Sequence, residues 1–156
     1  MRELFQFYCI DTSALVNMWR EHYRPKNFPS VWQLMKQYIE QGELVAPQEV
    51  HDELEVGNDD LFQFVKKTKR TMFKDLDAEQ VSLTFEIKAK FPKLSDDNKV
   101  IPDADPFVVA LACQKGWKVV TAESDKSPYK MPAACRHYRI PCLSPADFIA
   151  EKNWEI

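Results

Sequence analysis

Short apolar runs alternate with longer segments of helical periodicity along this chain. The first run covers residues 5–10 and ends at a single carboxylate, Asp11. Two hydroxyl residues, Thr12 and Ser13, follow, and apolar residues then recur at helical spacing to about His22. The pattern predicts a buried strand whose carboxyl end presents Asp11 where a helix begins. In open α/β sheets, ligands bind at this end of the strands.

The rest of the chain continues the alternation of strands and helices. Further strands are predicted at residues 44–46, 117–121 and 139–143, the last at an edge because it contains a proline. Helices are predicted at residues 29–41, 48–56, 59–73, 77–90, 106–115, 133–137 and 145–151. This order indicates a three-layer α/β/α fold, in which helices cover both faces of a short central parallel sheet. We expect the first strand in the centre, between the strands at 44–46 and 117–121.

Three residues mark the ends of predicted helices. Gly57 and Gly116 follow helical segments and are expected to close them. Asp105 precedes Pro106, so it is expected to cap the helix that Pro106 begins.

Length and composition agree with one soluble globular domain spanning residues 1–156. Apolar residues make up 45% of the chain and charged residues 29%, which argues against disorder. No apolar run is long enough to cross a membrane, and residues 1–4 lack the features of a signal peptide. We therefore expect a cytoplasmic protein without a membrane partner. The net charge of −3 counts mildly against nucleic acid as a partner, although charges can be segregated by face.

Four acidic positions are predicted to converge at the carboxyl edge of the sheet. Asp11 ends a strand, and Glu53 lies within a helix beside its buried stripe. Asp105 stands at a helix start, and Glu123 or Asp125 follows a strand. Carboxylates crowded in this way repel one another unless a cation joins them. A set of ligands with oxygen donors alone favours Mg²⁺ or Mn²⁺.

The surroundings of these acids leave two interpretations open. Thr12, Ser13 and Thr121 are placed to hydrogen-bond the carboxylates and so to orient metal ligands. Aspartate also favours helix caps and turns, so a purely structural role remains open for the three aspartates. Glu53 has no such explanation, because it lies inside a helix.

A group of basic residues suggests a further site. Four cations, Lys66, Lys67, Lys69 and Arg70, gather in the second half of the helix predicted at 59–73. They form either a solvated face that suits the helix dipole or an electrostatic track for the phosphate backbone of RNA.

The cysteines give little support for a metal site. Cys135, His137 and Cys142 are a weak zinc candidate, because only three donors are present and their spacing matches no common pattern. The four cysteines contain no Cys-x-x-Cys pair, which fits a reduced compartment.

Four segments, taken in order, resemble the PIN domain: residues 9–15, 46–54, 105–112 and 116–121. Among PIN-like proteins, the chain is most similar to a family of bacterial and archaeal proteins described as a domain of unknown function (DUF4411). The likeness extends over nearly the whole chain. PIN domains are Mg²⁺- or Mn²⁺-dependent nucleases, and many are toxins of toxin–antitoxin pairs that cut RNA.

The resemblance carries specific site residues with it. It implies that Asp11, Glu53 and Asp105 are metal-site acids, with Asp103 a weaker alternative to Asp105. The usual Thr-x-Asn-x-x-Asp ending of PIN domains is replaced here by residues 121–125. The fourth acid is therefore either Glu123 or Asp125.

The resemblance implies a metal-dependent endoribonuclease that is the toxin of a type II toxin–antitoxin system. Its expected partners are an RNA substrate, a cognate antitoxin and a second copy of the chain. The alternative is a non-catalytic RNA- or protein-binding module that has kept the fold. Metal binding distinguishes the two, since an inert module need not bind Mn²⁺.

Overall fold

Five parallel strands form one sheet in the computed structural model, which describes residues 6–96 and 98–156. The strands are β1 (Tyr8–Ile10), β2 (Leu44–Pro47), β3 (Phe73–Lys74), β4 (Lys118–Val120) and β5 (Cys142–Leu143). Their order across the sheet is β3-β2-β1-β4-β5, and every neighbouring pair is parallel. The central position predicted for the first strand is therefore confirmed.

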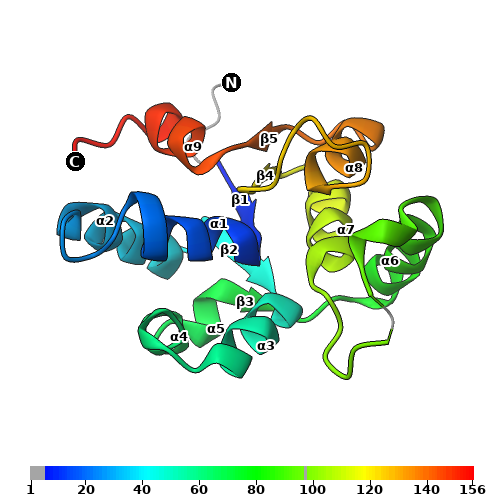
Figure 1. Cartoon of the computed structure of the whole chain (residues 1–156), viewed down its shortest axis with the longest axis horizontal. Helices are drawn as coiled ribbons and strands as arrows, with labels where there is room; N and C mark the ends of the chain where they lie inside the picture. Colours follow the sequence, from blue (N-terminus) through cyan, green and yellow to red (C-terminus); the bar gives the residue numbers. More distant parts are fainter. Residues whose placement is uncertain (1–5, 97) are drawn as a thin grey trace.

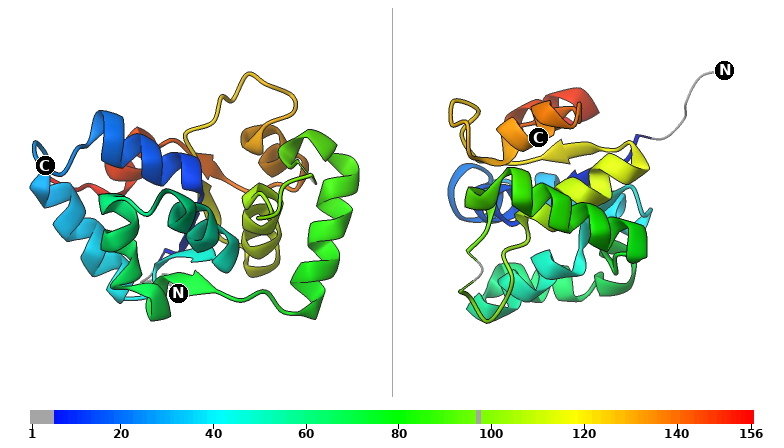
Figure 2. Two further views of the ribbon diagram at one scale, coloured as in Figure 1. Left: turned by 60° about the horizontal axis from the view of Figure 1, so that its bottom comes forward. Right: turned by 90° about the vertical axis from the view of Figure 1, so that its right-hand side faces the viewer.

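Helices cover both faces of this sheet (Figure 1). In that view α1 and α2 lie to the left of the strands and α6 and α7 to the right, and Figure 2 shows α6 running alongside α7. The three-layer α/β/α architecture is thus confirmed. The helices are α1 (Thr12–Asn17), the π-helix η1 (Met18–His22), α2 (Pro29–Glu40), α3 (Gln48–Gly57), α4 (Asp60–Lys66), α5 (Lys69–Met72), α6 (Ala78–Lys90), the 3₁₀-helix η2 (Pro92–Leu94), α7 (Asp105–Lys115), α8 (Met131–His137) and α9 (Pro145–Lys152). Among the described residues, no helix is both long and apolar enough to cross a membrane.

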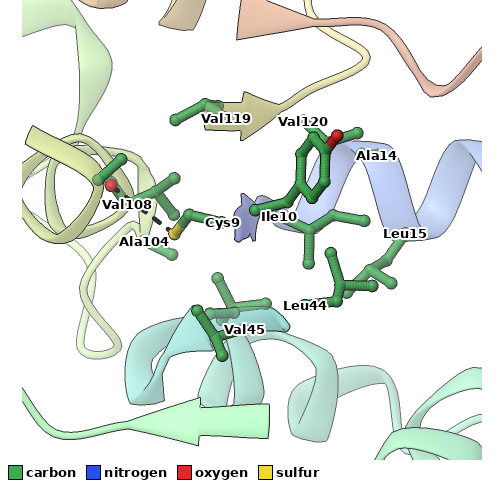
Figure 3. Packing of buried hydrophobic residues seen from close by; sticks show 14 of the residues in the cluster. Cys9, Ile10, Ala14, Leu15, Leu44, Val45, Ala104, Val108, Val119 and Val120 are labelled. Atoms are coloured by element: carbon green, nitrogen blue, oxygen red, sulfur yellow. Dashed lines mark hydrogen bonds between the residues drawn. The ribbon is translucent and has the colours of Figure 1, made fainter. Parts of the chain in front are cut away.

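The central strand is buried on both faces, as its apolar sequence predicts. The Tyr8 ring packs against Tyr38 of α2 and Phe148 of α9, at centroid distances of 6.0 and 4.9 Å. Cys9 points to the opposite face, where its Sγ lies 3.8 Å from the carbonyl oxygen of Val108 in α7 (Figure 3). Successive side chains of a strand alternate between faces, so β1 joins both helical layers into one core.

The prediction of one long helix at residues 59–73 is wrong. The chain forms two helices, α4 and α5, and then the short strand β3. Thr68 separates the helices, and its buried hydroxyl donates to the carbonyl oxygen of Val65 at 3.0 Å. Phe73 then pairs with Ala46 of β2. A strand of two residues is too short to show a period of its own, so the sequence pattern could not reveal it.

Helix and strand ends differ from the predictions in several details. Gly57 belongs to α3, and Asn58 closes that helix in the left-handed conformation, with φ of 43°. Asp105 is the first residue of α7, and Ala104 takes the cap position instead. Gly116 does close α7, with φ of 71°.

Three strands are shorter than predicted, among them β4, which covers Lys118–Val120 within the predicted residues 117–121. The last strand shortens to Cys142–Leu143, because Arg139 has a positive φ of 59° that no extended strand adopts. The first strand begins at Tyr8, and residue 5 of its predicted range lies outside the described residues. Residues 1–4, on which the absence of a signal peptide was argued, lie outside them too.

Candidate active site

Asp11 lies at the carboxyl end of β1 and is completely buried. Its Oδ1 accepts hydrogen bonds from the backbone N–H of Ala14 and from the hydroxyl of Ser13, both at 2.8 Å. Its Oδ2 accepts from the hydroxyl of Thr121, which follows β4. Asp11 therefore caps α1 with one oxygen and faces the neighbouring strand with the other. Burial outweighs these hydrogen bonds and raises the pKa of Asp11 to about 7.

Asp105 and Glu123 meet Asp11 from two other elements. Asp105 starts α7 and Glu123 follows β4, and single carboxylate oxygens of the three residues all lie within 4.8 Å of one another. Asp105 is hydrogen-bonded to Glu123, and burial, followed by the charges of Asp11 and Glu123, raises the pKa of Asp105 to about 10. The cluster thus holds protons that separate carboxyl groups would have released at neutral pH.

Glu53 extends from α3 to the edge of this cluster. Its Oε1 accepts a hydrogen bond from the hydroxyl of Thr12, and its Oε2 accepts from the backbone N–H of Ala104 at 3.2 Å. Burial raises the pKa of Glu53, and its charge contributes to the raised pKa of Asp105. Glu53, Asp105 and Glu123 line one hollow of about 260 Å³. The structure therefore brings acids from α3, α7 and the loop after β4 to one side of Asp11.

Two acids considered from the sequence lie outside the cluster. Asp125 is exposed and is not among the three acids whose oxygens converge. Asp103 accepts from the backbone N–H of Asp96 at 2.7 Å and from Lys99 Nζ at 2.8 Å, so it orders the loop before α7. Of the two alternatives after β4, Glu123 lies in the cluster and Asp125 does not. Of the two before α7, Asp105 lies in it and Asp103 does not.

The cation cluster Lys66, Lys67, Lys69 and Arg70 lies away from the acids. These residues line a surface hollow together with Glu40, at the end of α2. Both α2 and α5 lead into the starts of strands, so this hollow is at the amino edge of the parallel sheet. Asp11 and Glu123 follow the carboxyl ends of their strands. An RNA strand bound at the cations would have to pass around the molecule to reach the acids.

A second set of cations, which the sequence analysis missed, lies beside the acids. Lys93, Lys99 and Lys130 line the hollow that contains Glu53, Asp105 and Glu123, together with the aromatic ring of Tyr129. Lys130 Nζ is 3.9 Å from Glu123 Oε1. The lysines lie on three separate loop or 3₁₀ segments, so no run of charge marks them in the sequence. Lys99 and Lys130 lie near Asp105 and Glu123 in the sequence, but Lys93 does not.

The cysteines form no zinc site with His137. The thiols of Cys135 and Cys142 are hydrogen-bonded to each other. The His137 ring instead contacts the rings of Phe91 and Tyr138, at centroid distances of 5.5 and 4.8 Å. In the part of the chain that the structure describes, no group of three potential metal ligands includes these residues.

Comparison with solved structures shows a shared fold at low sequence identity. VapBC2 from Rickettsia felis, bound to a DNA fragment from its promoter, aligns with a TM-score of 0.56 and 12% identity, over 89% of this chain and 98% of that one. FitAcB from Neisseria gonorrhoeae aligns with a TM-score of 0.54 and 14% identity, over 90% of this chain and 99% of that one. DNA-bound VapBC from Salmonella typhimurium aligns with a TM-score of 0.55 and 12% identity, over 90% of this chain and 99% of that one. These neighbours confirm the PIN-like fold.

Comparison of sequences identifies a family but no curated relative. The family model described as "Domain of unknown function (DUF4411)" matches residues 8–156. No curated protein matches the chain. The matched segment covers all five strands and contains all the acids described above.

Proposed function

We propose that this chain, which belongs to the DUF4411 family and has a PIN-like fold, is a metal-dependent endoribonuclease and the toxin component of a type II toxin–antitoxin system. The observation that carries the proposal is the convergence of Asp11, Asp105 and Glu123, whose oxygens lie within 4.8 Å of one another. Lys130 Nζ lies at the edge of this group of acids, 3.9 Å from Glu123 Oε1.

The donor set fits a hard divalent ion. All the converging atoms are carboxylate oxygens, which are the ligands that Mg²⁺ and Mn²⁺ prefer over softer donors. The pKa of Asp105 is raised largely by burial and by its acidic neighbours, and a bound cation would relieve that repulsion. Asp11 is held in place by Ser13, Thr121 and the backbone of Ala14, so its free lone pairs are oriented before an ion arrives.

Each residue has a distinct part in the proposed reaction. Asp11, Asp105 and Glu123 hold Mg²⁺ or Mn²⁺, which when bound supplies a water of lowered pKa and stabilises charge on the scissile phosphate. Glu53 orients the attacking water or the ion, because Thr12 and the Ala104 N–H fix both of its oxygens. We assign the fourth acid to Glu123 in preference to Asp125, since only Glu123 reaches the other carboxylates.

The toxin assignment rests on the likeness to PIN toxins and on the shared fold with VapBC and FitAcB structures. By this analogy we propose a cognate antitoxin as protein partner, RNA as substrate and the cytoplasm as location. A homodimer belongs to the same proposal.

Cleavage of single-stranded RNA tests the catalytic part. The parent protein should cleave with Mg²⁺ or Mn²⁺ and stop cleaving in EDTA. Asp105→Asn and Glu123→Gln should lose activity, whereas Asp125→Asn, a matched change at an exposed acid of the same loop, should keep it. Equal cleavage with and without chelator would refute the proposal. Loss in Asp125→Asn with full activity in Glu123→Gln would instead reassign the fourth acid.

A further inference from the structure

An exposed aromatic ring lies at the rim of the acid hollow. Tyr129 is 53% exposed. It lines the hollow together with Glu53, Asp105 and Glu123. The ring is therefore open to solvent within the same hollow as the proposed metal ligands.

The backbone connects this ring directly to the cluster. The N–H of Tyr129 donates to the hydroxyl of Ser127 at 3.2 Å, which holds the turn before α8. Two residues further along, the N–H of the fully buried Met131 donates to Glu123 Oε2 at 3.3 Å. The segment that carries Tyr129 is thus tied at one end to a proposed metal ligand. A group stacked on Tyr129 would lie next to whatever the acids hold.

Lys93 occupies a cation–π position over the Tyr129 ring. Its Nζ lies 4.0 Å from the ring centroid. Lys93 belongs to the 3₁₀-helix η2, which buried Leu94 anchors to the core. Two independently anchored segments therefore place a flat π-surface and an ammonium group together, beside the acids. This is the pairing with which proteins bind single-stranded nucleic acid, with the ring stacking a base and the cation contacting a phosphate.

We propose that Tyr129 and Lys93 form a binding platform for single-stranded RNA, in which an unpaired base stacks on Tyr129 and the adjoining phosphate contacts Lys93. The proposal rests on the proposed nuclease function and assigns the two residues that position an unpaired base of its RNA substrate. In an RNA duplex the base faces are covered by their neighbours, so the ring would have no base to stack on. Lys130, 3.9 Å from Glu123, extends the same cationic surface along the hollow.

The test measures binding by fluorescence anisotropy with a labelled oligoadenylate. Ca²⁺ replaces Mg²⁺ as a hard cation with oxygen ligands, and a gel checks that the RNA stays intact. Tyr129→Leu should bind about five- to a hundredfold more weakly than the parent, since stacking one base contributes about 1–3 kcal/mol. Tyr129→Phe keeps the ring and should bind like the parent. Phe85→Leu removes a similarly exposed ring, 66% exposed on α6, and serves as the matched control.

A second arm separates stacking from general loss of affinity. An oligomer with the same ribose-phosphate backbone but without bases should bind the parent much more weakly than oligoadenylate does, and Tyr129→Leu should show a much smaller difference. The slope of the logarithm of the binding constant against the logarithm of salt concentration should be shallower for Lys93→Gln, by an amount that corresponds to about one phosphate contact.

The outcomes distinguish the platform from the nuclease. If the parent binds and cleaves RNA, and Tyr129→Leu binds both oligoadenylate and the oligomer without bases as tightly as the parent does, the platform is refuted and the nuclease proposal stands. If the parent neither binds nor cleaves RNA, both proposals fail.

Discussion

The pKa values of acids shift in opposite directions at the two edges of the sheet. At the amino edge, Glu151 of α9 accepts hydrogen bonds from the Tyr8 hydroxyl and from Lys118 Nζ, the latter at 2.8 Å. Although burial acts to raise it, these partners hold the pKa of Glu151 below its usual range. At the carboxyl edge, burial and the neighbouring acids Asp11 and Glu123 raise the pKa of Asp105 to about 10.

The contrast separates structural acids from functional ones. Glu151 is stabilised by a cation of its own chain, so its ionised form adds to the stability of the fold. Asp105 meets other carboxylates in a buried place, which costs stability unless an ion from solution joins them. The raised pKa of Asp105 among these acids therefore supports the proposal that the carboxyl edge holds the functional site.

The largest effect is expected from Glu53, and it tests whether convergence or burial makes an acid functional. Glu53 and Glu49 lie one turn apart on α3, and burial raises the pKa of both. Only Glu53 lines the hollow with Asp105. Glu53→Gln should lower RNA cleavage by at least about a hundredfold, since metal-site interactions contribute several kcal/mol to the transition state. Glu49→Gln should cleave like the parent.

Thermal melts accompany this pair of variants, because a loss of folding would also abolish cleavage. Both proteins should melt near the parent temperature. An inactive Glu49→Gln beside an active Glu53→Gln would reverse the comparison.

A smaller effect is expected in the pH dependence of stability. The pKa of Asp105 is about 10 in the folded protein and about 3.9 in an unfolded chain. Between these values only the folded state keeps the proton, so this group weakens the fold as the pH rises from 4 toward 8. Without metal, Asp105→Asn should therefore gain stability relative to the parent over this range, by at most about 1.4 kcal/mol per pH unit.

Glu151→Gln should show the opposite trend. The pKa of Glu151 is lowered by folding, so its contribution is present above the unfolded pKa and is lost as the pH falls through the folded one. The variant should be less stable than the parent at pH 7, by about 1 kcal/mol or less because the pair is partly exposed, and close to it at pH 3. Urea titrations at several pH values measure both trends. Parallel pH profiles for the two variants would contradict the distinction between the edges.

The sequence carried enough information for the architecture and the main acids. The apolar run before Asp11 predicted the central strand, because a buried parallel strand needs apolar side chains on both faces. The position of Glu53 beside the stripe of Val50 and Leu54 predicted that it faces inward, and Val50 and Leu54 are indeed buried.

Other features depend on long-range contacts that no local pattern records. The strand β3 has two residues and exists through its pairing with β2. The choice between Glu123 and Asp125 depends on how the loop after β4 folds back, where the Met131 N–H holds Glu123. The cationic residues nearest the acids are dispersed among loops, whereas the conspicuous run Lys66–Arg70 lies at the other edge of the sheet.

Metal-linked stability tests the central claim most directly, since the claim is that the carboxyl edge is built to hold a divalent ion. An ion that binds only the folded state stabilises it by about 2.7 kcal/mol at a hundredfold excess over its dissociation constant. Melting curves with and without Mn²⁺ should show a clear rise in the melting temperature of the parent and of Asp125→Asn, and a much smaller rise in Asp11→Asn. Asparagine is also a good helix cap, so the substitution removes a charge without removing the cap. Equal Mn²⁺-induced shifts in the parent and Asp11→Asn would contradict the account.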